Sequence, residues 1–438
     1  MDDLVPSLYG EYGRYINETR AFPFILDGAK LVERRLLYTL YEVTKNGFVK
    51  SATVVGHCLG HYHPHGDVSL YGSLVTLVQN GLAIGQGNWG MNYGVDDNPP
   101  AAQRYTEVKS NPKIMDIALE YIKSVPYKKL EMDFDEPIFL PTRLPICLIG
   151  TTNYCEGIGF GYSTKIPVYT KKDLIKRLEW LLGGKKGQEP LIKPITDCTL
   201  ISEDNDFREL LTTGKAKILF KGKYVKESRN SIIITSIPPS RQFQTILSKF
   251  EKEIADEKSL AWQDESKTST KVRFMIVKPR SLDIDDVCKK LDAVLTSAVT
   301  FECNVCNTSG KVVRLGIDDM LLNVYKVYTQ VVQLVLQEQI KQADAKIIEL
   351  DIISKLRPLL RDQLKDNPDD VSKAITEIAK ALNLQETIIK EIFDKYIITR
   401  IFKIKTETGK LQEEKSELNK KLSNLSQYIW KEKYQNDL

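Results

Sequence analysis

The chain has 438 residues, of which 42% are hydrophobic and 27% are charged, and its formal net charge at pH 7 is +4. This composition is ordinary for a soluble protein with a buried core, and the length predicts about three domains. No stretch approaches the roughly 18 consecutive apolar residues of a membrane helix, and the acidic start of the chain excludes a signal peptide. The seven cysteines are spread along the chain, which predicts the reducing cytoplasm and no disulfide framework.

Basic residues and helical periodicity stand out near the start of the chain. Leucines recur on one face of residues 31–40, which predicts a helix that also carries Arg34 and Arg35. Arg20 and Lys30 precede it. Basic side chains opposite an apolar stripe usually face solvent, so this cluster alone indicates no particular ligand.

The histidines are confined to one short segment. They are His57, His61, His63 and His65. Pro64 favours an extended turn, and Asp67 suits the start of a helix over residues 68–79. Imidazoles and a helix N-terminus aimed at one spot suit a phosphate group, whereas imidazoles together with Cys58 could hold zinc. A structural role is the third alternative, and the residues alone leave all three open.

Two further segments of this region lack regular periodicity. Residues 85–90 read Gly-Gln-Gly-Asn-Trp-Gly, which predicts a loop that is neither helix nor strand. Residues 101–107 follow a proline-containing loop and place Tyr105 directly after Arg104. The pair is nearly uninformative by itself, because most of the 20 tyrosines in the chain are expected to be packing residues.

The middle of the chain alternates between β-branched runs and amphipathic patterns. We predict strands over residues 217–221, 231–237 and 271–277 and helices over residues 241–255 and 285–296. This pattern is typical of an α+β fold. The single Cys-x-x-Cys, Cys303 to Cys306, is weak evidence for zinc because no second pair accompanies it.

In the last part of the chain glycine nearly disappears and helical periodicity takes over. Apolar residues alternate four and three apart over residues 336–350, and a longer heptad series covers residues 397–429. Two short helical patterns lie between them, over residues 371–382 and 387–398. The simplest geometry is an antiparallel coiled coil with a helical knob at about residues 358–396, although a plain helical bundle would produce the same pattern.

Several short motifs are uninformative singly but specific when they are taken together in chain order. They resemble the gyrase A and topoisomerase IV A-subunit family of type IIA DNA topoisomerases, strongly over residues 14–170 and more weakly to the end of the chain. Tyr-His-Pro-His-Gly-Asp together with Arg-Tyr-Thr-Glu is highly specific. The motifs are Arg20-Ala21-Phe22-Pro23, Asp27-Gly28-Ala29-Lys30, Arg34-Arg35, Tyr62-His63-Pro64-His65-Gly66-Asp67, Gln86-Gly87-Asn88-Trp89-Gly90, Ala101-Ala102-Gln103-Arg104-Tyr105-Thr106-Glu107, Gly157-Ile158-Gly159-Phe160-Gly161 and Lys165-Ile166-Pro167.

The resemblance implies an α+β multidomain fold in three parts. Residues 1–155 would form a winged-helix breakage-reunion domain, the DNA gate, with the catalytic tyrosine. Residues 156–316 would form an α/β tower domain. Residues 317–438 would form a long antiparallel coiled coil, with a helical dimerisation gate at its tip near residues 358–396.

The resemblance also implies roles for individual residues. Tyr105 would attack a DNA phosphodiester, form a 5′-phosphotyrosyl bond and release a 3′-hydroxyl, while Arg104 would stabilise charge on the phosphoryl oxygens. Ile158 would wedge between base pairs and bend the duplex. The residues expected to hold the DNA backbone are Arg20, Lys30, Arg34, His63 and His65.

Four positions depart from the family's pattern. Glu33 stands where the bacterial family usually has a histidine, and His61 replaces a lysine. A carboxylate cannot bind phosphate directly, although Glu33 could orient a neighbouring arginine. Val68 and Gly72 occupy the positions where relatives carry the serine and the acidic residue that anchor fluoroquinolones through a water–magnesium bridge, so we expect this chain to be insensitive to those drugs.

The resemblance, together with what the sequence lacks, implies the cofactors and partners. It has no G-x-x-x-x-G-K-[ST] phosphate loop and no segment that resembles the family's ATPase or TOPRIM modules. Mg2+ and ATP would therefore be bound mainly by a partner subunit, and no metal site is expected in this chain. The expected assembly is a homodimer on double-stranded DNA, joined to ATPase/TOPRIM subunits in a heterotetramer.

The expected activity is that of an ATP-dependent isomerase. The chain ends at Leu438 without the DNA-wrapping domain that gyrase uses, so relaxation or decatenation is expected rather than negative supercoiling. This short form is similar to the medium subunit of T-even phage topoisomerases, which makes a bacterial cell or a phage-infected host the expected setting. Two rival functions stay open, a non-enzymatic DNA-binding scaffold and a zinc-dependent hydrolase.

Overall fold

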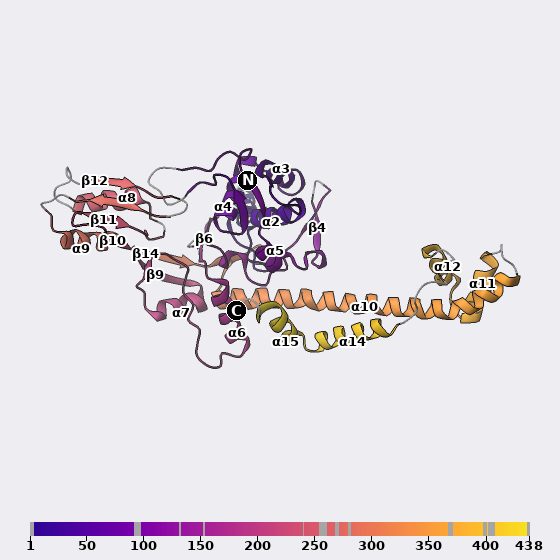
Figure 1. Ribbon diagram of the computed structural model, residues 1–438. Coiled ribbons are helices and arrows are strands. Elements are labelled where there is room, and N and C mark those ends of the chain that lie inside the picture. The colour runs from indigo at the N-terminus through magenta and orange to yellow at the C-terminus, as the bar shows by residue number, and fades with distance from the viewer. Residues whose placement is uncertain are drawn as a thin grey trace. The chain divides into compact units, whose positions relative to one another are not determined.

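The structure of the protein is a computed structural model that divides into two compact units (Figure 1). The first comprises residues 1–328 and 434–438, and the second comprises residues 329–433. The first unit therefore extends beyond the boundary expected at residue 316. The structure describes residues 4–91, 98–130, 133–151, 154–239, 241–253, 261–267, 271–278, 282–366, 371–396, 401 and 408–435.

Helices pack beside a small antiparallel sheet early in the first unit, with the strand order β1-β3-β2. Leu36, Leu37 and Leu40 are fully buried, so the predicted leucine stripe is the core face of α2. The helix predicted after His65 is confirmed as α4. In chain order the elements are α2 (Leu31–Val43), β1 (Val49–Lys50), α3 (Ser51–His61), α4 (Asp67–Gln79), β2 (Ala83–Gln86) and β3 (Glu107–Ser110).

Part of the glycine-rich segment that we predict to be a loop is a strand. Gly85 and Gln86 belong to β2, where Gly85 pairs with Val108 of β3. A Cβ on Gly85 would lie 2.3 Å from Nε1 of Trp89, so the glycine leaves room for the indole. The loop prediction is wrong here because pairing with a distant segment, rather than local turn preference, decides the backbone.

Three flanking elements bear on the site. Helix α1 (Leu4–Ile16) leads directly into a π-helical turn over Asn17–Ala21. Strands β4 (Tyr127–Lys129) and β5 (Asp135–Pro137) form an antiparallel hairpin.

Two larger sheets follow in the first unit, as the α+β pattern predicts. The predicted strands and helices are confirmed, with ends shifted by a few residues, as β9 (Lys215–Lys221), β11 (Ser231–Ile234), β13 (Phe274–Val277), α8 (Phe243–Glu253) and α9 (Ile284–Val294). Strand β6 includes residue 155, where a domain boundary was expected, and it pairs with β7 of the five-stranded sheet. The sheet orders are β6-β7-β14-β9-β8 and β10-β11-β13-β12. The strands are β6 (Tyr154–Ile158), β7 (Ser163–Pro167), β8 (Thr199–Leu200), β9 (Lys215–Lys221), β10 (Tyr224–Lys226), β11 (Ser231–Ile234), β12 (Ala261–Asp264), β13 (Phe274–Val277) and β14 (Thr296–Glu302).

Helices α8 (Phe243–Glu253) and α9 (Ile284–Val294) pack on one face of the four-stranded sheet. Phe243 of α8 stacks on Phe274 of β13, with the ring centroids 3.5 Å apart. Leu291 of α9 joins the same core. The alternate residues of β11 and β13 that reach this core give the sheet a buried face, as period-two patterning requires.

A buried ion-pair network fastens the start of α10 (Ile317–Asp366) to α6 (Lys171–Leu182) within the first unit. The side chain of Arg177 is 1% exposed. Its Nε and Nη2 donate to the two carboxylate oxygens of Asp318, each at 2.8 Å, and its Nη1 donates to Glu189 at 2.8 Å. Both carboxylates therefore compensate a charge that is removed from water.

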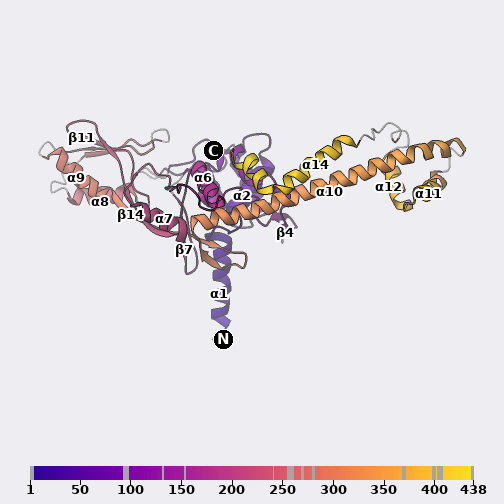
Figure 2. The same cartoon turned by 90° about the horizontal axis from the view of Figure 1, so that it is seen from below.

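In the second unit a returning helix lies beside α10. Helix α14 (Gly409–Ser423) runs along α10 in both views (Figures 1 and 2), and Nζ of Lys415 lies 2.5 Å from Oδ1 of Asp344. The single helix predicted over residues 397–429 is not continuous, because Asn424 leaves helical geometry before α15 (Leu425–Ile429). Asparagine favours such breaks by competing for backbone hydrogen bonds. Residues 397–400 and 402–407 of that prediction lie outside the described residues.

Two short helices pack against the end of α10 in the second unit. They are α11 (Val371–Leu382) and α12 (Glu386–Lys395), which match the two short helical patterns of the sequence. Their core contains Leu356 and Leu360 of α10, Ile378 of α11 and Ile389 of α12. We call this cluster the helical knob.

The cysteines are free thiols, and several are buried. Burial raises the pKa of Cys58 to about 11, so this thiol stays protonated at neutral pH. Cys303 and Cys306, the Cys-x-x-Cys pair, are both buried. No helix within the described ranges is long and apolar enough to cross a membrane.

Candidate functional site

The loop that carries Tyr105 is held by buried hydrogen bonds to α3 and α4. The backbone N–H of Ser51 donates to the carbonyl oxygen of Thr106 at 3.0 Å, and the Thr106 hydroxyl donates to Oγ of Ser51 at 2.8 Å. The Tyr71 hydroxyl donates to the carbonyl oxygen of Ala101 at 2.6 Å and lies 2.9 Å from Oγ1 of Thr106. Thr106 is fully buried, so the loop is preorganised up to the residue that follows Tyr105.

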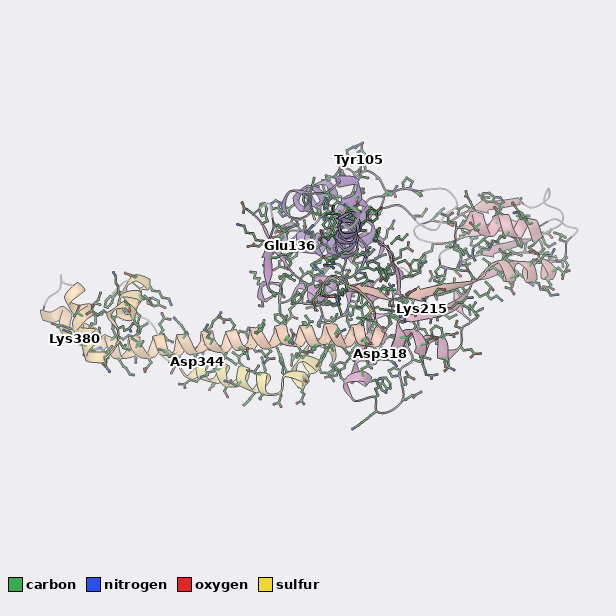
Figure 3. All side chains as sticks on the ribbon, turned by 180° about the vertical axis from the view of Figure 1, so that it is seen from behind. Tyr105, Glu136, Lys215, Asp318, Asp344 and Lys380 are labelled. Carbon is green, nitrogen blue, oxygen red and sulfur yellow. The ribbon has the colours of Figure 1, made fainter. Side chains whose placement is uncertain are left out.

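Tyr105 itself is open to solvent at the edge of the first unit (Figure 3). Its side chain is 66% exposed. The guanidinium carbon of Arg104 lies 4.6 Å from the centroid of the Tyr105 ring, within the range of a cation–π contact. Gln103 donates to Oδ2 of Asp67 at 3.2 Å, which ties the loop to the first turn of α4. A phenol and a guanidinium thus share an exposed position beside a helix N-terminus, an arrangement that suits a phosphate group.

His63 lies at the end of a buried polar network that begins at a distant carboxylate. Glu136 of β5 is 1% exposed and accepts a forked pair of hydrogen bonds from Arg35, from Nε at 2.6 Å and from Nη2 at 2.9 Å. The remaining Nη1 of Arg35 lies 2.9 Å from Nδ1 of His63. Nζ of Lys128 adds a contact of 3.0 Å to Glu136. The network joins β4, β5 and α2 to the histidine loop.

Protonation of His63 should make the protein less stable in acid. Burial, together with the charges of Arg35, His65 and Arg20, lowers the pKa of His63 from 6.5 to about 4, and Glu136 opposes this shift. Between these two pH values the unfolded chain binds a proton that the folded chain does not, so stability falls as the pH falls through this window. The midpoint of urea unfolding should drop between pH 7 and pH 4.5, and His63→Gln should reduce that drop. An equal drop in both proteins would contradict the assignment.

His65 links the histidine loop to the N-terminal helix. Its Nε2 lies 3.3 Å from the hydroxyl of Tyr15, and its ring centroid lies 4.8 Å from that of His63. Nearby, the backbone N–H of Phe160 donates to the side chain of Asn17 at 2.7 Å, and Nδ2 of Asn17 donates back to the carbonyl oxygen of Phe160 at 3.2 Å. The end of α1 therefore connects the histidine loop to the β6–β7 hairpin.

Ile158 stands at the end of β6 in this hairpin and is 88% exposed. A Cβ on Gly157 would lie 1.9 Å from the carbonyl oxygen of Ala21, and a Cβ on Gly159 would lie 2.3 Å from Oδ1 of Asn17. Only glycine therefore lets the hairpin approach the π-helical turn that carries Arg20. Arg20 is itself exposed, so a cation and a large apolar side chain are presented on neighbouring elements.

The basic cluster of α2 divides into an accessible part and a buried part. Lys30 is half-buried, and its Nζ donates to the carbonyl oxygen of Glu156. Glu33 accepts from the backbone N–H of Lys30 at 2.9 Å, so it caps α2 instead of orienting a neighbouring arginine. Arg34 is 6% exposed and donates to Asp27 at 2.7 and 3.2 Å. The expectation that Arg34 holds DNA is corrected, because its guanidinium is buried and paired within the protein.

Several residues around the site carry no signal in the sequence. Glu136 lies 101 positions from Arg35, and Tyr15 lies 50 positions from His65. Gln103 and Thr106 belong to a quoted motif, but their anchoring role depends on partners in α3 and α4. Only a partner that folding brings near distinguishes these side chains from ordinary polar residues.

His57 and His61 have different partners from those of His63 and His65. Their rings stack with centroids 3.9 Å apart, and Nε2 of His57 lies 3.4 Å from Oε2 of Glu42. The Tyr62 hydroxyl donates to the same carboxylate oxygen at 2.7 Å. In the parts of the chain that the structure describes, no group of three His, Cys, Asp or Glu residues is arranged to hold a metal ion.

Comparison with known proteins identifies the family. The family model for the DNA gyrase/topoisomerase IV A subunit matches residues 20–438. The chain belongs to this family. The matched residues include Tyr105, the histidine loop and the β6–β7 hairpin.

The relatives in this family are longer proteins. The A subunit of DNA topoisomerase 4 from Bacillus subtilis (strain 168) is 33% identical over 262 residues, which are 54% of this chain and 31% of that protein. The corresponding subunits of Staphylococcus aureus and Staphylococcus epidermidis (strain ATCC 12228 / FDA PCI 1200) are 31% and 32% identical over 281 residues, which are 59% of this chain and 34% of each relative. The matched part thus spans about a third of each relative.

Proposed function

We propose that this chain is the DNA cleavage and religation subunit of an ATP-dependent type II topoisomerase, in which Tyr105 bonds transiently to DNA. The observation that carries the proposal is the exposed Tyr105, with Arg104 over its ring, on a loop fixed by buried hydrogen bonds. Cleavage and religation are the general role of this family of A subunits. The element order α2-β1-α3-α4-β2-β3 supports a winged-helix DNA gate.

In the proposed reaction the phenol oxygen of Tyr105 attacks a backbone phosphorus. The phenol gives up its proton to solvent, the bond from phosphorus to O3′ breaks, the 3′-oxygen takes up a proton from solvent to become a hydroxyl, and the 5′-phosphate stays on the tyrosine. Arg104 neutralises charge on the phosphoryl oxygens. Because the phosphotyrosine keeps the energy of the broken bond, the reverse attack reseals DNA without a nucleotide. The proposed backbone contacts are Arg20, Lys30, His63 and His65.

Ile158 is proposed to insert between base pairs next to the gate. An apolar wedge unstacks one step at a cost of a few kcal/mol and bends the duplex, which lets more of the DNA contact protein. The 88% exposure of Ile158 supports this role, since an isoleucine in this position adds no buried apolar surface to the core. The close contacts at the flanking glycines hold the hairpin that presents it.

Magnesium and ATP are proposed to be supplied by a second subunit with TOPRIM and ATPase modules. The proposed assembly is a homodimer on double-stranded DNA with two such partners. It would relax or decatenate DNA in the cytoplasm of a bacterium or of a phage-infected cell.

One experiment separates this proposal from its rivals. The chain and its partner are incubated with supercoiled DNA, the reaction is stopped with detergent, and protein bound to DNA ends is assayed. Covalent attachment to 5′ ends is expected here, whereas a DNA-binding scaffold or a zinc-dependent hydrolase would leave none. Absence of attachment with an active partner present would reject the proposal.

The purified chain should dimerise through the helical knob. Helices α11 and α12 share a core with α10, which holds them in one arrangement and lets them present a constant surface to a second copy. Sedimentation at micromolar concentration should show a dimer, and deletion of residues 358–396 should shift it to monomer while the Tyr105 domain stays folded. A monomeric intact chain would contradict this prediction.

Fluoroquinolones should stabilise cleavage complexes only weakly. Val68 is 80% exposed on the first turn of α4 but offers no oxygen to a metal-bound water, and Gly72 has no side chain. A Cβ on Gly72 would meet nothing within 4 Å, so Val68→Ser with Gly72→Glu is sterically allowed and should raise drug sensitivity at least about tenfold. Drug titrations of cleavage, run beside a sensitive bacterial enzyme, test this. Equal potency on the unmodified chain would show that other contacts hold the drug.

A further inference from the structure

We infer that Glu136 and Arg35 are positioning residues that keep the proton of His63 on Nε2, so that His63 offers an N–H donor to the scissile region of DNA. The inference rests on the proposed function and extends it to residues that make no contact with DNA. Its starting point is the contact of 2.9 Å between Nη1 of Arg35 and Nδ1 of His63. A guanidinium is always protonated and can only donate, so Nδ1 must accept and the proton of the neutral ring must lie on Nε2.

Glu136 is what makes the contact directional. Both of its carboxylate oxygens take the fork of Arg35, at 2.6 and 2.9 Å, and a forked pair fixes the plane of a guanidinium as well as its position. Arg35 and Glu136 are both buried, so water cannot take the place of either partner without a large cost in free energy. Because Nε and Nη2 of Arg35 are both bonded to Glu136, the remaining nitrogen, Nη1, is aimed at His63.

The backbone holds the other end of the contact. The N–H of His63 donates to the carbonyl oxygen of Cys58 at 2.8 Å, and the N–H of His65 donates to the carbonyl oxygen of His63 at 2.7 Å. Ring and guanidinium therefore meet in one orientation. The pKa of His63, which burial lowers to about 4, agrees with a ring that stays neutral and donates from Nε2 at physiological pH.

Helix α2 supplies a matched control. Arg34, the neighbour of Arg35, forms the same kind of buried fork with Asp27, at 2.7 and 3.2 Å, but its other contact is the ring of Phe24 and not a histidine. Disturbing that pair should cost stability without changing His63. Lys128 provides a second control, because it contacts Glu136 at 3.0 Å without touching Arg35 or the histidine loop.

The tautomer can be measured directly, because the chain has only four histidines. Protein labelled with 15N-histidine gives separate ring signals for nitrogens with and without a proton, and His63→Gln identifies the signals of His63. We expect wild type at pH 7 to show an unprotonated Nδ1 and a protonated Nε2. Glu136→Gln keeps the shape but loses one acceptor of the fork, so the His63 signals should move toward a mixture of tautomers. Asp27→Asn and Lys128→Met should leave them unchanged.

Cleavage assays complete the test. With partner, DNA and detergent stop, Glu136→Gln should form the covalent complex at least about tenfold more slowly, and its pH–rate profile should shift. Arg35→Lys keeps the charge without the fork and should behave in the same way. A wild-type His63 with its proton on Nδ1, or a Glu136→Gln protein with wild-type signals and rate, would overturn the inference. If the wild-type protein formed no covalent complex, the proposed function would instead be rejected, whichever ring nitrogen of His63 carries the proton.

Discussion

Tyr105→Phe should abolish covalent attachment to DNA while leaving DNA affinity within about twofold, because phosphate contacts supply most of the binding. Tyr105 is 66% exposed, so loss of its hydroxyl should not disturb the fold. The phenylalanine ring also keeps the face on which Arg104 rests, 4.6 Å from the ring centroid. Detergent-stopped cleavage assays give the covalent fraction, and filter binding in the same buffer gives the affinity.

Tyr12→Phe is the matched control, since Tyr12 of α1 is also more than half exposed and lies outside the proposed site. It should leave both measurements unchanged. Arg104→Ala should lower the rate of attachment by about a hundredfold to a thousandfold, the range for removal of one donor to a transition-state oxyanion. Wild-type attachment by Tyr105→Phe would show that another group bonds to DNA, and the assignment of the nucleophile would fail.

Asp318→Ala should destabilise the first unit by about 3–5 kcal/mol, the range for breaking a buried ion pair from one side. The side chain of Arg177 is 1% exposed and donates two hydrogen bonds of 2.8 Å to Asp318. Glu189 would then be its remaining carboxylate partner, and that side chain is partly exposed. Urea unfolding, followed by tryptophan fluorescence to which Trp180 beside Arg177 contributes, reports the loss.

Asp319→Ala controls for the effect of charge at the start of α10. Asp319 occupies the same first turn and has the same charge, but its side chain is exposed. Its favourable interaction with the helix dipole is worth about 0.3–1 kcal/mol. If the two variants lost equal stability, the buried pair would contribute no more than the dipole and the network would not be what joins α10 to α6.

The sequence predicts well those features that depend on neighbouring residues. Helix α11 begins and ends where the helical pattern predicts, at Val371 and Leu382, because periodicity reports directly which face meets a core. Asp67 marks the start of α4 for a similar local reason. The order of short motifs was enough to predict the family, and it is also the basis for the prediction that Tyr105, among 20 tyrosines, is the nucleophile.

Features that depend on distant partners were decided by the tertiary structure. Arg34 and Arg35 are chemically identical neighbours, yet successive helix positions point about 100° apart, so one meets Asp27 and the other meets Glu136 and His63. The sequence indicates two cations but cannot say which carboxylate each will meet, because Glu136 comes 101 positions later. Gly85 shows the same limit, since a strand forms only when its partner Val108 is brought alongside. Periodicity and turn chemistry act within a few residues, whereas burial and pairing of charges exist only after the chain has folded.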